Sequence, residues 1–237
     1  WINNIVVIII MNIPKINKNN KHKFIFLFDL DGTILSERIH QQVYEDALKT
    51  LHPNLSFSWE EYLTACNEKK YKGSVREYLF QNKNLTRNQA NEVRVLKTKN
   101  VVDTEHEIIF MDGFENLFKK IKEHNINWAV VTNAPETYTN FVRKNSDLLN
   151  STTQWLPREK YKLAKPNSDP YDTAVRLFKK PPEKYIIGFE NSINGINAIK
   201  QVANVVFGCY KESHCQECKD IILFKNYNDI IDTIFQE

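Results

Sequence analysis

Two aspartates one residue apart follow a purely apolar segment of this chain. The apolar residues are 24–28, and Asp29-Leu30-Asp31 and then Gly32-Thr33 come directly after them. A segment that is apolar on both faces is typical of a strand buried in a parallel sheet. Open α/β sheets place their ligands at the carboxyl ends of such strands, where two aspartates could provide a nucleophile, a proton carrier and a cation site. Taken alone, the segment also fits an ordinary Asp-Gly turn.

Three later strand ends carry polar residues of matching kinds. Thr132 and Asn133 offer a hydroxyl and an amide that suit an anionic oxygen. Lys165 precedes a predicted helix and could direct its ammonium group to the same point. Glu190 and Asn191 offer a carboxylate and an amide oxygen for a hard cation. Singly, each has an ordinary alternative: Thr132 as a helix N-cap, Lys165 as a solvated surface charge and Glu190 as a surface acid.

Alternating strand and helix patterns predict the fold that positions these residues. Besides the first strand, short apolar segments at 127–131, 185–189, 204–207 and 221–224 are predicted strands. Helical spacing of apolar residues lies between them, at Phe114, Leu117, Phe118 and Ile121, and again at Tyr171, Ala174, Val175 and Phe178. Strands that alternate with helices predict an α/β fold with a doubly wound parallel sheet.

The segment 36–107 differs from the rest of the chain. It has no convincing strand, and capping boxes at Ser58 with Glu61 and at Thr86 with Gln89 predict two helix starts. We therefore expect a small all-helical domain at 36–107, inserted into a core domain formed by residues 23–35 and 108–237.

The first 22 residues are expected to form a poorly ordered extension. The first methionine is Met11, which we interpret as the natural start, and the residues after it are rich in Asn and Lys. An added edge strand is the competing interpretation.

Composition limits the class of protein. The 237 residues, 42% of them hydrophobic and 26% charged, suffice for one α/β domain with a modest insertion. The net charge is +3, and Lys and Arg are scattered among acids, so nucleic acid is not indicated as a partner. The apolar run at 5–10 is too short to span a bilayer. Four unevenly placed cysteines do not form a disulfide framework, so we expect a cytoplasmic protein. We also expect a monomer or a weak dimer.

Together and in this order, these residues resemble the four motifs of the haloacid dehalogenase-like superfamily of phosphohydrolases. The motifs are Asp29-Leu30-Asp31-Gly32-Thr33, then Thr132, Lys165 and Glu190-Asn191, and the resemblance covers residues 24–235. The segments 165–171 and 189–196 are similar to the β-phosphoglucomutase and phosphoglycolate phosphatase branch. The resemblance implies a Rossmann-like core with an inserted helical cap.

The resemblance implies a phosphomonoester hydrolase that works through an aspartyl-phosphate. Asp29 would attack phosphorus, and Asp31 would protonate the leaving oxygen and then deprotonate the incoming water. Thr132 and Lys165 would bind the oxygens of the transferring group. Gly32, Thr33 and Asn133 would also bind the substrate. The expected substrate is a small phosphorylated metabolite.

The resemblance also implies Mg²⁺ as the cofactor. The ion would lie between Asp29, the carbonyl of Asp31 and the motif Glu190-Asn191. The branch usually has Asp where this chain has Asn191, and a neutral amide ligand weakens the attraction for the cation. We therefore expect a raised magnesium requirement.

The inserted domain implies a mobile cap that closes over the site. Its single glycine, Gly73, lies in a segment similar to the branch's substrate-specificity loop, and Arg76 could contact an anionic group of the substrate. The alternative is a helix C-cap at Gly73 with a surface Arg76.

Other reactions remain open at this point. A phosphosugar mutase would use a further lysine after the second motif, and 133–137 contains none. A dehalogenase would have no use for Asp31. Phosphonate cleavage would need a cap lysine, for which the candidates are Lys69, Lys70 and Lys72. A non-catalytic phospholigand-binding protein is the alternative from another class, favoured only by Asn191.

A separate cluster of possible metal ligands occurs near the C-terminus. Cys209, His214, Cys215 and Cys218 include one CxxC pair, but a structural zinc site usually needs a second well-spaced pair. A loop with free thiols is the favoured interpretation.

Overall fold

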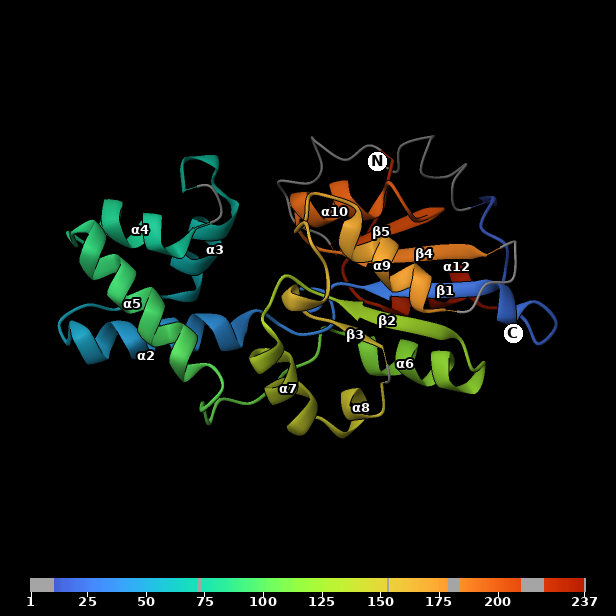
Figure 1. The fold of residues 1–237 in the computed structure, drawn as a ribbon, viewed down its shortest axis with the longest axis horizontal. Coiled ribbons are helices and arrows are strands. Elements are labelled where there is room, and N and C mark those ends of the chain that lie inside the picture. The colour runs from blue at the N-terminus through green and yellow to red at the C-terminus, as the bar shows by residue number, and fades with distance from the viewer. Residues whose placement is uncertain (1–10, 72–73, 153, 179–183, 210–219, 237) are drawn as a thin grey trace. The chain divides into compact units, whose positions relative to one another are not determined.

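The computed structural model of the chain describes residues 11–71, 74–152, 154–178, 184–209 and 220–236. The chain divides into two compact units (Figure 1). The core unit comprises Trp1–Ser36 and Phe110–Glu237, and the helical unit comprises Glu37–Ile109. Among the described residues, no helix combines the length and the apolar character that crossing a bilayer requires.

The core unit contains a six-stranded parallel sheet with the strand order β3-β2-β1-β4-β5-β6. This arrangement confirms the predicted doubly wound α/β fold. The strands are β1 (Phe24–Phe28), β2 (Asn127–Val131), β3 (Trp155–Leu156), β4 (Tyr185–Glu190), β5 (Val205–Cys209) and β6 (Ile222–Phe224). The sequence analysis missed β3 because two residues leave no detectable alternation.

The central strand, β1, pairs with both β2 and β4. Phe28 lies opposite Val130 on one side and Phe189 on the other. The carboxyl ends of three strands therefore lie side by side, at the position where α/β sheets bind ligands.

Helices cover both faces of the sheet (Figure 1). The side chains that they meet differ between the two faces. Ile25 and Leu27 of β1 join an aliphatic cluster with residues of α9 (Asp169–Leu177) and α10 (Ile193–Ile199). Phe28 points to the other face, where its ring contacts Phe114 of α6 (Phe114–Glu123). The same aromatic layer includes Tyr227, the N-cap of α12 (Asn228–Ile234). A strand buried on both faces explains why β1 has no polar residue.

The remaining elements of the core unit lie in its connections. These are α7 (Glu136–Lys144), α8 (Asp147–Asn150) and the 3₁₀ turns η1 (Lys21–Lys23) and η3 (Arg158–Lys160). The apolar spacing at 114–121 and 171–178 correctly predicted α6 and α9, and Phe178 is the C-cap of the latter.

The helical unit consists of α2 (Arg38–Leu51), α3 (Trp59–Asn67), the 3₁₀ turn η2 (Lys69–Tyr71), α4 (Val75–Asn82) and α5 (Arg87–Asn100). Both predicted capping boxes are present. The Ser58 hydroxyl accepts from the Glu61 N–H, and the Glu61 carboxylate accepts from the Ser58 N–H. Thr86 and Gln89 form the same pair of bonds. The unit has its own core, built around buried aromatic and aliphatic side chains of all four helices.

The described part of the N-terminal extension packs on the core unit. Ile13 and Ile16 are buried, and Ile16 forms a parallel bridge with Phe235. The Ile16 N–H donates to the Ile234 carbonyl at 2.9 Å, and the Ile16 carbonyl accepts from the Gln236 N–H at 3.0 Å. The expectation of a poorly ordered extension is therefore wrong for this segment. The prediction followed the high Asn and Lys content of the segment. It did not allow for Ile13 and Ile16, whose burial lowers the free energy of the folded state.

Replacing Ile16 should show that this segment is part of the core. Ile16→Ala removes a side chain that is 0% exposed, so we expect a loss of about 2–5 kcal/mol in the free energy of unfolding. Met11→Ala is the control, because Met11 is 79% exposed and its loss should change the same quantity by less than about 0.5 kcal/mol. Urea unfolding measures both, and equal stability of the two variants would contradict the packing.

Candidate active site

The loop that follows β1 holds Asp29 and Asp31 in a fixed turn. The Asp29 N–H donates to the Phe189 carbonyl at 3.0 Å, which extends the pairing with β4 by one residue. The backbone N–H groups of residues 33, 34 and 35 converge on the Leu30 carbonyl. Gly32 has a φ of 80°, a left-handed conformation that favours glycine. The Asp-Gly pair is therefore a turn as well as part of the candidate site.

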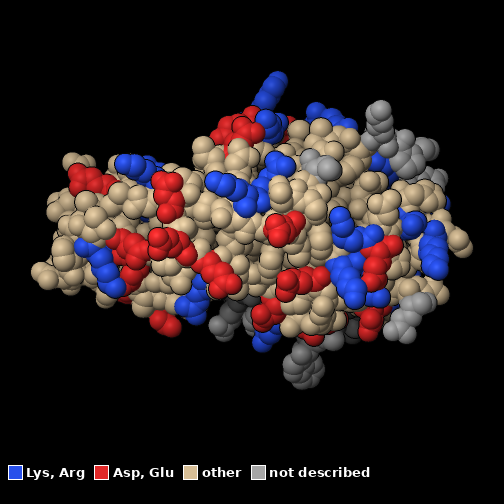
Figure 2. All heavy atoms as spheres, turned by 90° about the horizontal axis from the view of Figure 1, so that it is seen from below, with Lys and Arg blue, Asp and Glu red and all other residues tan. Residues whose placement is uncertain are grey.

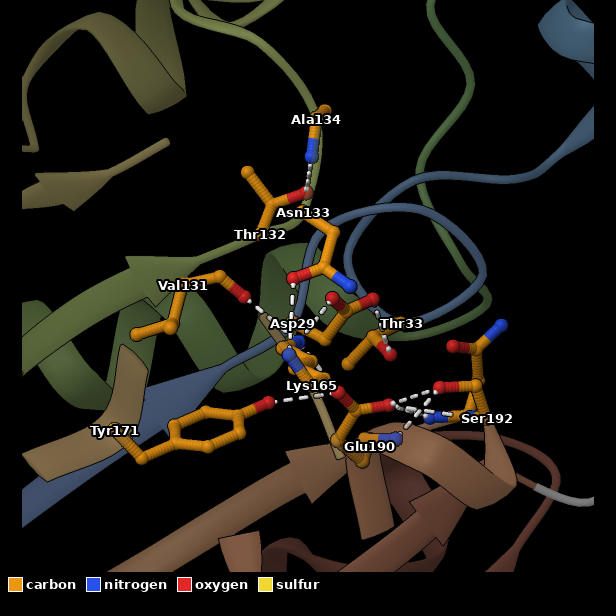
Figure 3. A network of polar contacts seen from close by, with 12 residues as sticks. Asp29, Thr33, Val131, Thr132, Asn133, Ala134, Lys165, Tyr171, Glu190 and Ser192 are labelled. Atoms are coloured by element: carbon orange, nitrogen blue, oxygen red, sulfur yellow. Dashed lines mark hydrogen bonds and ion pairs between the residues drawn. The ribbon is translucent and has the colours of Figure 1, made fainter. Parts of the chain in front are cut away.

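Lys165 lies between two carboxylates at the centre of the site (Figure 3). Its Nζ donates to Asp29 Oδ1 at 2.6 Å, to Glu190 Oε1 at 2.5 Å and to the Val131 carbonyl at 2.9 Å. The side chain of Lys165 is only 3% exposed and that of Glu190 is 0% exposed. The acceptors follow or end β1, β2 and β4, so the lysine joins the three neighbouring strand ends. The alternative interpretations of Lys165 and Glu190 as surface charges are wrong.

Both carboxylate oxygens of Glu190 are occupied by hydrogen-bond donors. Oε1 accepts from Lys165 and, at 2.7 Å, from the Tyr171 hydroxyl. Oε2 accepts from the Asn191 N–H at 2.9 Å, the Ser192 N–H at 3.1 Å and the Ser192 hydroxyl at 3.2 Å (Figure 3). A carboxylate offers about four lone-pair sites, and these donors use them. Glu190 was predicted as a metal ligand, and in this structure its carboxylate contacts the Lys165 ammonium and holds it in place.

The three buried charges differ in their preferred protonation states. Burial, together with Glu190, raises the pKa of Asp29 to about 7, although Lys165 opposes the shift. Burial would also raise the pKa of Glu190, but Lys165 and the surrounding donors outweigh it and lower that pKa. Burial would lower the pKa of Lys165, and the two carboxylates outweigh it and raise that pKa. Of the two carboxylates, Asp29 is therefore the one whose ionised form a further positive charge would stabilise more.

Asp29 and Asn191 carry oxygens of a kind that suits a hard cation. Asp29 Oδ2 accepts only a long bond of 3.5 Å from the Thr33 hydroxyl among the contacts of the described residues. The side chain of Asn191 is buried, and no hydrogen bond to its amide is found within the described part of the chain. The described residues contain no group of three His, Cys, Asp or Glu side chains arranged for a metal. A cation here would depend on Asp29, the Asn191 amide oxygen and a backbone oxygen, all of which are hard ligands.

Thr132 and Asn133 present donors beside the same carboxylate. Thr132 Oγ1 accepts from the Ala134 N–H at 3.0 Å and keeps its own proton for another acceptor. The N-cap of α7 is Pro135, so Thr132 is not the cap of that helix. Asn133 Oδ1 accepts from the Lys165 N–H at 3.4 Å, and Figure 3 shows the amide nitrogen on the side that faces Asp29. These two donors suit an anionic oxygen placed above Asp29.

Two tyrosines that the sequence analysis did not single out contact the site. The Tyr161 hydroxyl lies 2.8 Å from both the Thr132 carbonyl and Asn133 Oδ1. The Tyr138 hydroxyl donates to Asp31 Oδ1 at 2.9 Å. Neither tyrosine follows a strand end directly, so sequence spacing carried no signal for them.

Other predicted residues belong to the helical unit, to the end of β5 or to the part of the chain that is not described. Arg76 is exposed on α4 of the helical unit. Lys70 is exposed and pairs with Glu68 at 2.9 Å. Cys209 is buried at the end of β5. Residues Lys72, Gly73, His214, Cys215 and Cys218 lie outside the described residues.

Comparison with known proteins places this site in a family. The family model for haloacid dehalogenase-like hydrolases matches residues 26–208. Three similar solved structures share the fold. A predicted phosphoglycolate phosphatase from Haemophilus somnus is 20% identical, with a TM-score of 0.68 over 90% of this chain and 97% of that one. A mutant of CbbY from Rhodobacter sphaeroides in complex with xylulose-(1,5)bisphosphate is 17% identical, with a TM-score of 0.66 over 90% and 99%. A family IA, variant 3 hydrolase from Entamoeba histolytica is 18% identical, with a TM-score of 0.64 over 88% and 96%.

The family match includes Asp29, Lys165 and Glu190, the three charged residues that meet at the sheet edge. The chain is a member of the haloacid dehalogenase-like hydrolase family.

Proposed function

We propose that the protein hydrolyses a phosphate monoester of a small metabolite through an aspartyl-phosphate on Asp29. The observation that carries the proposal is the contact of the buried Lys165 ammonium with Asp29, beside the donors of Thr132 and Asn133. A carboxylate and a phosphate dianion repel each other, and a fixed cation between them reduces that repulsion. The CbbY structure in complex with a sugar bisphosphate supports the substrate class by similarity of fold.

Two displacement steps follow from this arrangement. The Asp29 carboxylate attacks phosphorus while the bond to the leaving oxygen breaks, and Asp31 gives that oxygen its proton. Water then attacks the phosphorus of the aspartyl-phosphate, Asp31 takes the proton of the water, and Asp29 and inorganic phosphate are released. Lys165, Thr132 and Asn133 bind the non-bridging oxygens during both steps. Gly32 and Thr33 line the proposed phosphate site, where the Thr33 hydroxyl lies 3.5 Å from Asp29 Oδ2.

The proposed cofactor is Mg²⁺, held by Asp29, the Asp31 carbonyl and Asn191. When bound, the ion supplies positive charge that neutralises phosphate oxygens and aligns them for attack. The high pKa of Asp29 without a cation supports this requirement, because the nucleophile has to be ionised.

The distribution of surface charge agrees with a small-molecule substrate. On the face drawn in Figure 2, acidic and basic side chains of the described residues are interspersed, without one large basic field. We propose the exposed Arg76 of the helical unit as a contact for a second anionic group of the substrate. The absence of lysine from residues 133–137 favours water over a sugar hydroxyl as the phosphoryl acceptor.

Removing the nucleophile should abolish hydrolysis. Asp29→Asn cannot form the aspartyl-phosphate, so we expect Mg²⁺-dependent hydrolysis of p-nitrophenyl phosphate to fall by roughly 10³-fold or more. Asp147→Asn is a matched control on the exposed first turn of α8 and should retain full activity. Equal rates in the wild type and Asp29→Asn would reveal a contaminating phosphatase and remove support for the function.

Restoring a charged ligand at position 191 should strengthen magnesium binding. Asn191→Asp adds one negative charge to the proposed cation site, so we expect the Mg²⁺ concentration for half-maximal activity to fall by about tenfold. Titration of hydrolysis against Mg²⁺ measures it. A wild-type value as low as that of Asn191→Asp would refute the raised requirement.

Position 195 tests whether Glu190 positions Lys165. A Cβ atom on Gly195 would lie 1.8–2.2 Å from the Glu190 carboxylate, so Gly195→Ala has to displace that group. We expect a loss of about 1–3 kcal/mol in the free energy of unfolding, measured in urea, together with a lower kcat. Asn194→Ala, an exposed neighbour in α10, is the control for both measurements. Unchanged stability and kcat in Gly195→Ala would show that the Glu190 carboxylate has room to move.

A further inference from the structure

The proposed acid and base, Asp31, has a partner on a different element of the core unit. The hydroxyl of Tyr138, in the first turn of α7, donates to Asp31 Oδ1 at 2.9 Å. The two residues are 107 positions apart in the chain, so the contact depends on the packing of α7 beside the loop that follows β1.

Tyr138 is well placed to hold this bond. The residue is only 2% exposed, and its ring stacks on Phe141 of the same helix. Its own N–H donates to the Pro135 carbonyl at 3.1 Å, and the preceding Glu136 N–H donates to Glu159 Oε2 at 2.9 Å. Backbone bonds therefore fix the turn that carries the tyrosine.

The hydroxyl is a donor in both protonation states of Asp31. Burial, with a contribution from Asp31, raises the pKa of Tyr138 well above its usual range, so the phenol keeps its proton. A carboxylate and a protonated carboxyl group both have an oxygen that accepts such a bond. The contact can therefore persist while Asp31 gives up and regains a proton.

Asp31 is less buried than Asp29. Asp29 is held by a buried ammonium, whereas Asp31 is only half-buried and lies in a loop. A proton donor works efficiently only when its acidic oxygen points at the leaving group. Because Tyr138 fixes one oxygen of Asp31, it also fixes the direction of the other.

We propose that Tyr138 is a positioning residue that orients Asp31 for proton transfer to the leaving group. The inference rests on the proposed function. Only the proton of Asp31 is transferred: it passes to the leaving oxygen in the first step and is replaced from water in the second. The phenolic proton stays on Tyr138 throughout.

Two aryl phosphates with different leaving groups test the inference. Phenol is a much weaker acid than p-nitrophenol, so phenyl phosphate depends more on protonation of its leaving oxygen. For Tyr138→Phe we expect kcat/KM to fall about tenfold for phenyl phosphate, the value of one hydrogen bond, and by less than about threefold for p-nitrophenyl phosphate. The ratio of the two kcat/KM values is independent of the fraction of enzyme that is folded, so a loss of stability does not obscure the result.

Two further variants complete the experiment. Tyr185→Phe removes a phenol from the first residue of β4, at the opposite end of that strand from Glu190, and should leave both kcat/KM values unchanged. In an Asp31→Asn background, Tyr138→Phe should have no further effect on the ratio, because there is no acid left to orient.

The outcomes separate the inference from the function on which it rests. An equal loss for both substrates, no loss, or faster hydrolysis by Tyr138→Phe would overturn the positioning role while the enzyme remains a phosphatase. If the wild type shows no Mg²⁺-dependent hydrolysis of either substrate that Asp29→Asn removes, the proposed function itself is wrong.

Discussion

The structure of the site depends on one buried ammonium group shared by two carboxylates. Removing Lys165, Asp29 and Glu190 from water carries a large desolvation cost, which is recovered only when geometry and hydrogen bonding are good. The fold meets this condition by aligning the ends of β1, β2 and β4, since each strand contributes an acceptor at or just after its end. The Tyr171 hydroxyl and the backbone N–H groups of residues 191 and 192 donate to the remaining acceptor sites of the Glu190 carboxylate. The order of the strands thus determines the position of the charges.

The two carboxylates that share the Lys165 ammonium have different numbers of hydrogen-bond donors around them. Glu190 has donors on every side and stays ionised as a structural partner of the lysine. Asp29 has one short bond, from Lys165, and one long contact, from the Thr33 hydroxyl. Burial raises the pKa of Asp29, so further positive charge nearby would stabilise its ionised form. A buried carboxylate with a raised pKa and few donors can bind a cation and can attack an electrophile. In the proposed cation site, the neutral Asn191 supplies less negative charge than an aspartate would.

Much of this could be predicted from sequence, because the strongest signals are local. Strands 24–28 and 127–131 and the two capping boxes follow from short-range patterns. The missed features depend on packing between distant segments. Ile16 meets Phe235, Tyr138 meets Asp31, and Tyr161 meets Asn133, and no spacing rule connects such pairs. The contacts of Glu190 with Lys165 and Tyr171 could not be predicted, because a sequence shows that an acid is present but not how many donors surround it.

The bridge between Ile16 and Phe235 also affects the order in which the chain can fold during synthesis. Ile16 pairs with the segment around Phe235, so this contact can form only after both segments have left the ribosome. The helical unit is continuous in sequence and makes its contacts within 37–109, which favours early and rapid folding. In arrested nascent chains, we expect the helical unit to resist limited proteolysis while the core unit is still cleaved. During translation, all residues of the helical unit are therefore synthesised before the last strands of the sheet.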